Sequence, residues 1–213
     1  MGTSGPVPYP PLKSATDKAL AALALLLVSP IFLAAVVGMG IDMLTVAYDR
    51  GPFLYRERRI SRGREFDLLK LRTLRIQALA SLGADGYARL AEADPANLTR
   101  AGRLLKRWYL DELPQLLNIL RGDMSLVGPR PWPVVMVEEQ AAAGLDYRNH
   151  VRAGWTGPAQ VQKGNPDPVS YAELDLGYVR ACRTWSQSRL LRYDLGILAQ
   201  TVIVLLRGQG LQY

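Results

Sequence analysis

Residues 19–41, ALAALALLLVSPIFLAAVVGMGI, decide how the chain is placed, because all 23 of them are uncharged. A run of about 20 apolar residues is long enough to cross a bilayer as a helix. The apolar core of a secretory signal is shorter, at roughly 7–15 residues, and no small-residue cleavage site follows this run. The sequence therefore predicts a retained membrane segment.

Two features favour a helix–break–helix hairpin that enters and leaves the membrane on one side. Ser29 and Pro30 lie at the centre of the run. Proline removes a backbone donor and clashes with the preceding turn, and Ser29 can hydrogen-bond a carbonyl that the proline frees. Lys13 and Lys18 precede the run and arginines follow it from Arg50 on. Basic residues mark the cytoplasmic end of a span, so both ends are predicted to be cytoplasmic. From these residues alone, a kinked spanning helix is an equally good interpretation.

Composition excludes several kinds of site. The chain of 213 residues has one cysteine, Cys182, and one histidine, His150. These counts exclude an internal disulfide framework, a thiolate metal cluster and a multi-histidine zinc site. We interpret Cys182 as a packing residue and His150 as a structural or surface residue. Any metal is expected to be a hard cation held by carboxylate and phosphate oxygens.

The positive charge is concentrated in one segment. The formal net charge is +7, and residues 50–75 hold nine Lys or Arg but only three Asp or Glu. Such a patch predicts an anionic partner, which could be nucleic acid, acidic lipid or a phosphorylated small molecule. A solvated surface with scattered ion pairs is the plain alternative.

The rest of the sequence predicts a mixed fold. Two runs around SRGR, at 61–64, are typical of a β-hairpin whose second strand ends near Leu71. Residues 98–120 have helical apolar spacing, with Thr99 as a possible N-cap. Pro114 interrupts that spacing and predicts two helices. Further helices are expected near 134–150, 171–182 and 190–207, the last of them docked on the core or in the membrane interface.

The expected fold class is therefore α+β, with a re-entrant membrane hairpin, a β-hairpin packed with helices, and amphipathic interfacial helices. The expected division of the chain is a tail at 1–18, a membrane hairpin at 19–48 and a catalytic domain at 49–213.

Four stretches resemble the bacterial monotopic phosphoglycosyl transferases, small membrane enzymes that begin lipid-linked glycan synthesis. The Ser29-Pro30 pair lies within an N-terminal apolar run, and residues 51–74 read GPFLYRERRISRGREFDLLKLRTL. Residues 110–131, LDELPQLLNILRGDMSLVGPRP, match the most diagnostic block of the family nearly verbatim. TGPAQVQKGN at 156–165 is similar to a C-terminal block, so the resemblance covers about 13–208.

The resemblance implies transfer of a sugar-1-phosphate from a UDP-sugar to a polyprenol phosphate such as undecaprenyl phosphate, with release of UMP. Asp111 would be the nucleophile and would help bind Mg²⁺ (or Mn²⁺). Glu112 would assist at the metal or accept a proton. Without the surrounding motif, an Asp-Glu pair at a helix start would be simple charge complementarity with the helix dipole.

Four cationic residues are candidates for binding the phosphates. Lys70 and Arg72 alternate on the second predicted strand, so they are expected to point to one face and converge on a diphosphate. Lys106 stands where the family usually has an arginine, and Arg130 lies between two prolines that stiffen its loop. Asp123 is not expected to be catalytic. The residues that choose the sugar are expected within 131–150 and 155–170.

The implied location is the bacterial inner membrane, with the protein monotopic and the active site facing the cytoplasm. Membrane lipids are expected partners, nucleic acid is not, and later glycosyl transferases would act on the product. Two alternatives stay open at this point. One is a membrane-anchored basic module that binds nucleic acid or acidic lipid, and the other is a glycosyl transferase that releases UDP.

Overall fold

The computed structural model describes residues 5–82, 88–162 and 170–207. The chain forms two compact units, to both of which α1, the β-hairpin and α5 contribute residues. The first unit comprises Met1–Ala21, Arg59–Phe66 and Asn118–Tyr213, and the second comprises Ala22–Arg58 and Asp67–Leu117.

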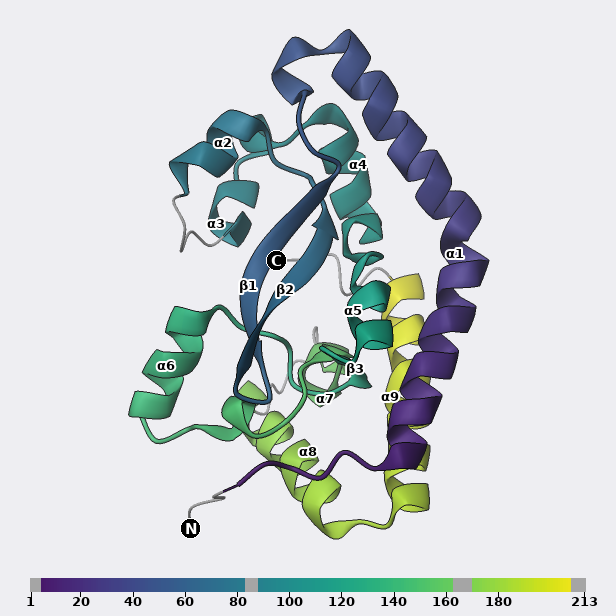
Figure 1. Ribbon diagram of the computed structural model, residues 1–213, viewed down its shortest axis with the longest axis vertical. Helices are drawn as coiled ribbons and strands as arrows, with labels where there is room; N and C mark the ends of the chain where they lie inside the picture. The colour runs from purple at the N-terminus through teal and green to yellow at the C-terminus, as the bar shows by residue number, and fades with distance from the viewer. Residues whose placement is uncertain (1–4, 83–87, 163–169, 208–213) are drawn as a thin grey trace. The chain divides into compact units, whose positions relative to one another are not determined.

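Helix α1 (Pro11–Thr45) is continuous through Pro30, so the break predicted at Ser29-Pro30 is not present in the structure (Figure 1). Proline at position 30 cannot donate to the carbonyl of Leu26, one turn earlier. The hydroxyl of Ser29 donates to that same oxygen, at 2.7 Å. The predicted hydrogen bond of Ser29 is therefore confirmed, and it supplies a donor to the carbonyl that Pro30 leaves without one. The helix also begins at Pro11, inside the expected tail.

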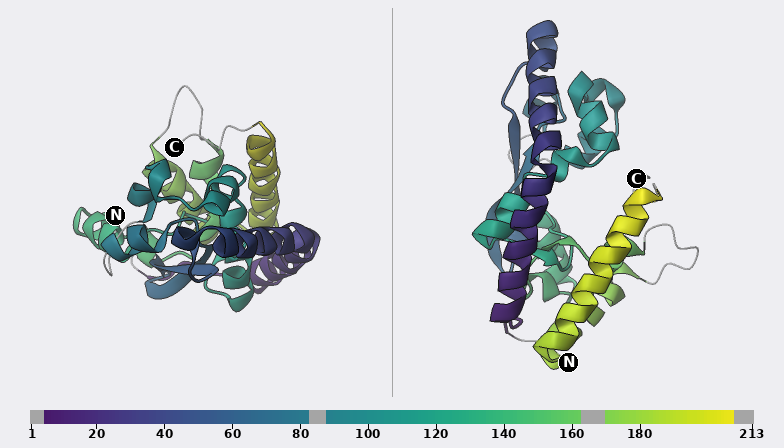
Figure 2. Two further views of the ribbon diagram at one scale, coloured as in Figure 1. Left: turned by 90° about the horizontal axis from the view of Figure 1, so that it is seen from above. Right: turned by 90° about the vertical axis from the view of Figure 1, so that its right-hand side faces the viewer.

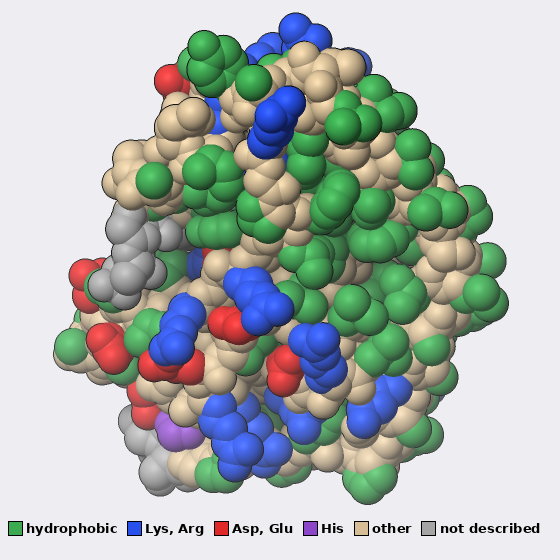
Figure 3. Space-filling view, turned by 45° about the horizontal axis from the view of Figure 1, so that its top comes forward, with side chains coloured by type: hydrophobic (Ala, Val, Ile, Leu, Met, Phe, Trp, Pro, Cys, Tyr) green, Lys and Arg blue, Asp and Glu red, His purple; other side chains and the backbone are tan. Residues whose placement is uncertain are grey.

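The middle of α1 is apolar and exposed. Leu26, Leu27 and Leu33 are each more than 60% exposed, and hydrophobic side chains line the right-hand side of the space-filling view (Figure 3). Among the described residues, α1 is the one helix long and apolar enough to cross a membrane. Large apolar patches in contact with water are rare in soluble proteins, so α1 is compatible with membrane association.

The second unit is built around the end of α1 and the start of α4. Its core contains two apolar clusters, one centred on Leu74 and Leu98 and the other on Met39, Leu71 and Leu105. Its further elements are η1 (Ala47–Asp49), α2 (Ile76–Ser81), α3 (Ala88–Glu92), η2 (Pro95–Asn97), α4 (Arg100–Arg107) and η3 (Leu110–Glu112).

Side chains cap the start of α4 at its free backbone N–H groups, as helix N-termini require. The predicted N-cap is confirmed, since Thr99 Oγ1 accepts from the Gly102 N–H at 2.8 Å. Asp42 accepts from Ala101 N at 2.9 Å, and Asp49 accepts from Arg100 N at 3.0 Å. The C-terminal end of α1 and the segment after it are thereby tied to α4.

The predicted β-hairpin is confirmed as β1 (Leu54–Ser61) and β2 (Arg64–Leu71), which form a two-stranded sheet. Arg62 and Gly63 make its two-residue turn with φ of 53° and 71°. Two central residues with positive φ are characteristic of the turn that suits the right-handed twist of a hairpin.

The first unit contains a second sheet, in which β3 (Ser125–Val127) runs parallel to β4 (Gly154–Thr156). The strands approach so closely that a Cβ on Gly154 would lie 2.1 Å from Gly128 N, which explains the glycine. The remaining elements are helices: α5 (Gln115–Arg121), α6 (Val134–Ala142), η4 (Tyr147–Asn149), α7 (Pro158–Val161), α8 (Tyr171–Thr184) and α9 (Gln187–Leu206).

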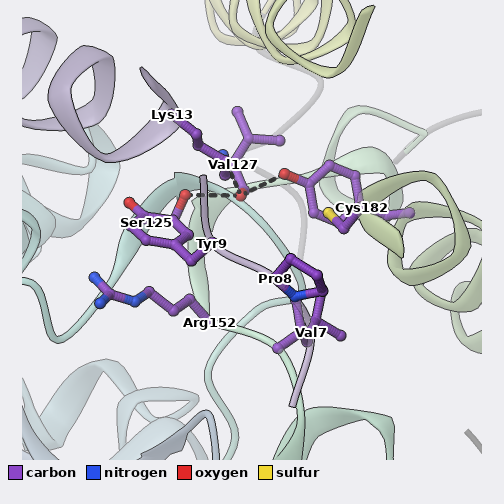
Figure 4. Close-up of a pocket in the computed structure, with 10 residues that line it drawn as sticks. Val7, Pro8, Tyr9, Lys13, Ser125, Val127, Arg152 and Cys182 are labelled. Atoms are coloured by element: carbon purple, nitrogen blue, oxygen red, sulfur yellow. Dashed lines mark hydrogen bonds between the residues drawn. The ribbon is translucent and has the colours of Figure 1, made fainter. Parts of the chain in front are cut away.

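A buried polar network fixes the N-terminal end of α1 beside α9 (Figure 2). Lys13 Nζ lies 2.6 Å from Asp194 and 3.6 Å from Asp17. Lys13, Ser125 and Tyr178 all donate to the carbonyl oxygen of Val127 (Figure 4). The charge of Lys13 is therefore balanced by two buried carboxylates inside the protein.

Candidate active site

Asp111 and Glu112 lie on η3, the short turn between α4 and α5, and both are buried. The chain reaches this turn through Tyr109, whose φ of 54° is left-handed. A bulky residue in this conformation is uncommon, and backbone strain of this kind is found most often at functional sites. Pro114 immediately precedes α5, so the prediction of two helices separated near this proline is confirmed.

Lys70, on β2, is one of the two ammonium groups near the acidic pair. Its Nζ lies 3.2 Å from Oε2 of Glu57, on the neighbouring strand β1. Burial favours the neutral amine, but the negative charges of Glu57, Glu112, Glu92 and Asp111 together outweigh it and raise the pKa of Lys70. Lys70 is therefore a permanently charged group held beside the acidic pair.

Lys106, on α4, is the second ammonium group. It forms an ion pair with Glu92 of α3, whose other carboxylate oxygen accepts from Thr73 Oγ1 at 2.7 Å. Both Lys106 and Glu92 act electrostatically on Asp111. The structure thus places Lys70 and Lys106 near Asp111 and Glu112, and the roles predicted for these four residues stay predictions.

The Asp111 carboxyl is unusually basic. Burial and then the negative charge of Glu112 raise its pKa to about 7, although Lys70 and Lys106 pull it down. A carboxyl group buried beside other carboxylates favours the neutral form unless a cation is added. Such perturbed groups are candidates for catalytic residues.

The composition of this group suits a cation bound together with an anionic ligand. Four carboxylates and two ammonium groups make up the group of Asp111, Glu112, Glu57, Glu92, Lys70 and Lys106. Within the described ranges, no cluster of three or more His, Cys, Asp or Glu residues has a geometry that would hold a metal by itself. A hard divalent ion here would need phosphate oxygens to complete its coordination.

Arg72 does not join this group. Its guanidinium is buried and donates to the backbone oxygens of Asp49, Pro52 and Leu74 at 2.6–2.8 Å. β2 ends at Leu71, but the Arg72 N–H still donates to the Phe53 carbonyl oxygen at 2.8 Å, so the backbone pairing of the hairpin reaches this residue. The structure gives Arg72 a bracing role in the second unit, and its predicted contact with a diphosphate gains no support.

Arg130 belongs to the first unit, in the loop between β3 and α6. A second arginine, Arg148, contacts this loop. Its guanidinium donates to the Arg130 carbonyl oxygen at 2.6 Å and stacks on the ring of Trp132 at 4.0 Å. The remaining guanidinium nitrogens of Arg148 donate to Gln140 at 3.0 Å and to Asp175 at 2.9 Å. These contacts of Arg148 hold the backbone of the loop that carries Arg130.

Three residues of these arrangements were not predicted from the sequence: Glu57, Glu92 and Arg148. Glu57 lies diagonally across the hairpin from Lys70, because the two-residue turn sets Glu57 opposite Leu68, and this register is the signal that could have identified it. Glu92 lies in a stretch with a weak helical pattern, and its pairing with Lys106 depends on how α3 packs. Nothing in the local sequence distinguishes Arg148 from the other arginines.

Comparison with known proteins places these residues in a family. Residues 9–208 match the model of the family described as bacterial sugar transferase. The exopolysaccharide production protein ExoY of Rhizobium meliloti is 36% identical over 213 residues, which cover 93% of this chain and 87% of that protein.

Two further relatives are named as UDP-glucose:undecaprenyl-phosphate glucose-1-phosphate transferases. The protein from Caulobacter vibrioides is 36% identical over 91% of this chain and 69% of its own length. The Escherichia coli protein is 32% identical over 90% of this chain, but the match spans only 39% of that longer protein. With a family model that matches nearly its whole length, the chain belongs to the bacterial sugar transferase family.

Proposed function

We propose that this protein is an enzyme that transfers a sugar-1-phosphate from a UDP-sugar to a polyprenol phosphate, with undecaprenyl phosphate as the acceptor and UMP as the second product. The observation that carries the proposal is the buried carboxyl of Asp111. It lies beside Glu112 and two lysines, and its pKa is about 7. The names of the Escherichia coli and Caulobacter relatives support the same class of donor and acceptor.

The first chemical step assigns Asp111 the role of nucleophile. A carboxylate oxygen of Asp111 attacks the phosphorus that carries the sugar, the bond from that phosphorus to the bridging oxygen breaks, and UMP leaves with the electron pair. The product is an acyl phosphate on the enzyme, which divides one difficult transfer into two easier ones. Lys70 and Lys106 are placed to offset the negative charge of the transferred group.

The second step regenerates the free carboxylate of Asp111. A phosphate oxygen of the polyprenol phosphate attacks the same phosphorus, the bond to Asp111 breaks, and a polyprenol diphosphate sugar is released. Glu112 accepts a proton from the incoming phosphate or assists at the metal. Arg130, on its rigid loop, is proposed as a further phosphate-binding residue.

Mg²⁺ (or Mn²⁺) is proposed as the cofactor, with Asp111 as the protein ligand and Glu112 as its neighbour. The fit rests on the raised pKa of Asp111, because a cation at this carboxyl would favour the ionised form that acts as nucleophile. When bound, such an ion stabilises negative charge on the phosphate oxygens.

We also propose that α1 enters and leaves one leaflet rather than crossing the membrane, by a bend at Pro30 that does not interrupt the helix. Two contacts support this topology. Near its start, Lys13 is paired with Asp194 of α9, and near its end, Asp42 caps α4. Both α4 and α9 belong to the chain that follows α1, and that chain has no further candidate span among its described residues. In the proposed topology, both of these contacts form on one side of the membrane.

The proposed side is the cytoplasmic face of the bacterial inner membrane. The exposed Arg50 and Arg56 follow α1, and such residues favour the cytoplasmic side. A site at this face would meet a soluble UDP-sugar and a polyprenol phosphate whose head lies at the membrane surface.

The test is the identity of the nucleotide released. The purified protein would be incubated with undecaprenyl phosphate, Mg²⁺ and a panel of UDP-sugars that begins with UDP-glucose, and UMP and UDP would be separated. We expect UMP, and we expect Asp111→Asn to lower its release by at least about 10³-fold while the protein stays folded. Release of UDP would show a glycosyl transferase that moves only the sugar.

A further inference from the structure

An arginine-lined pocket in the first unit lies among residues that the proposed reaction does not use. It has a volume of about 610 Å³ and is open to solvent. Arg62 and Arg64 come from the hairpin turn, Arg121 from the end of α5, and Arg152 from the segment before β4. Small-molecule sites commonly occupy roughly 300–1,000 Å³, so the pocket has room for more than a single phosphate group.

Hydrogen bonds between distant segments hold the walls of the pocket together. Arg62 N donates to the Val151 carbonyl at 2.9 Å. The hydroxyl of Ser61 donates to the Asp123 carbonyl at 2.5 Å and accepts from Ala153 N at 3.1 Å. These hydrogen bonds connect the hairpin turn to the end of α5 and to the segment before β4. The pocket is therefore formed by well-connected parts of this unit.

The charges that line the pocket are unbalanced. Four guanidinium groups face two carboxylates, those of Glu65 and Asp123. In the described part of the chain, none of the four arginines forms an ion pair, and Asp123 Oδ2 is already engaged by the amide of Asn118 at 3.1 Å. Like charges gathered around one hollow attract an anion to it.

One of the arginines is held in place by an aromatic ring, and another has an unusual backbone conformation. The guanidinium of Arg152 stacks on the ring of Tyr9 at 3.9 Å (Figure 4). A Cβ on Gly122, whose φ is +88°, would lie 3.3 Å from Arg152 Nη1, so the glycine leaves space for this group. Arg62 has a φ of 53°, a backbone conformation in which Gly, Asn or Asp is usual. The conformation of the turn therefore does not explain why this residue is an arginine.

We propose that this pocket binds a phosphate-bearing anion, either a diphosphate in solution or the phosphodiester of a lipid headgroup. Guanidinium groups bind phosphate oxygens through paired, charge-assisted hydrogen bonds, and four of them suit a ligand with more than one anionic oxygen. The pocket and the Asp111 group share no residue, so this binding is independent of the proposed reaction.

The test compares two double variants that remove the same charge. Arg64→Gln with Arg121→Gln changes exposed arginines of the pocket, and Arg180→Gln with Arg192→Gln changes exposed arginines on α8 and α9. The full chain, in micelles of an uncharged maltoside detergent that contains no phosphate, without divalent cations, would be titrated with sodium pyrophosphate. In a second series, phosphatidylglycerol would be added to the micelles instead. The readout is the rise in unfolding temperature that accompanies binding to the folded state.

We expect at least one probe to raise the unfolding temperature saturably in the wild type and in the α8–α9 pair. The pocket pair should need at least ten times more probe for the same rise. A response to pyrophosphate alone would identify a soluble ligand, and a response to phosphatidylglycerol alone would identify a headgroup. The proposal is overturned if neither probe acts on the wild type, if the pocket pair responds like the wild type, or if both pairs weaken equally.

Discussion

Replacing Arg148 by methionine should destabilise the first unit strongly. The side chain is buried, and its guanidinium donates hydrogen bonds to Arg130 O, Gln140 and Asp175 at 2.6–3.0 Å. Asp175 is 1% exposed, and within the described ranges its Oδ1 has no hydrogen-bond donor. The variant therefore leaves a buried carboxylate without its cationic partner.

The expected loss follows from that orphaned charge. Removing one partner of a buried ion pair costs about 3–5 kcal/mol in the free energy of unfolding. For a chain of this size, each kcal/mol lowers the unfolding temperature by about 2–4 °C. We therefore expect Arg148→Met to unfold roughly 6–20 °C below the wild type.

The assay is thermal unfolding of the purified protein, with two comparison variants. Asp175→Asn in the Arg148→Met background removes the orphaned charge, so the double variant should be more stable than Arg148→Met alone. Arg180→Met changes an exposed residue of α8 and should stay within about 0.5 kcal/mol of the wild type. A loss below about 1 kcal/mol for Arg148→Met would refute the assignment of this network.

Three further predictions address packing, burial and metal binding. Gly102→Ala should lower the free energy of unfolding in urea by about 1–3 kcal/mol, because the new Cβ would lie 2.2 Å from the Thr73 carbonyl oxygen. Gly177→Ala has open space around the new Cβ, so it should instead raise the free energy of unfolding by up to about 1 kcal/mol. Burial raises the pKa of the Cys182 thiol from 9.0 to about 11. The thiol should therefore react with iodoacetamide at pH 8 about 100-fold more slowly in the folded than in the urea-unfolded protein, and equal rates would contradict its burial. Chelation of divalent ions by EDTA should abolish UMP release, and added Mg²⁺ should restore it, whereas full activity in EDTA would exclude the proposed cofactor.

The elements with local signals were predictable from the sequence. The SRGR turn predicted the hairpin, Thr99 predicted the start of α4, and Pro114 predicted the division between α4 and α5, all of which the structure confirms. In each case the signal is a turn residue, a cap or a proline, whose backbone preference acts over a few residues.

The errors arose where one side chain decides the outcome. Pro30 predicted a break in α1, but Ser29 supplies a hydrogen bond to the Leu26 carbonyl and the helix continues. Arg72 was expected to converge on a diphosphate, but its buried guanidinium donates to three backbone oxygens. Neither the strength of one hydrogen bond nor the backbone partners of a buried guanidinium follow from an apolar pattern.

The candidate site was predicted from its motif, whereas its electrostatic surroundings were not. Asp111, Glu112, Lys70 and Lys106 were chosen by resemblance and by charge; they lie near one another in the structure, and their roles stay predictions. The partners Glu57 and Glu92 depend on the register of the hairpin and on the packing of α3. Contacts between distant segments of this kind have no signal in the local sequence.

The most direct test of the proposed mechanism is whether Asp111 itself carries the sugar phosphate. The protein would be mixed with Mg²⁺ and the UDP-sugar that supports UMP release, without polyprenol phosphate, quenched in acid, digested and mapped by mass spectrometry. We predict a sugar-phosphate adduct on the peptide that contains Asp111, formed together with UMP, lost on addition of undecaprenyl phosphate and absent from Asp111→Asn. An adduct on another residue, or undiminished turnover by Asp111→Asn, would contradict the mechanism.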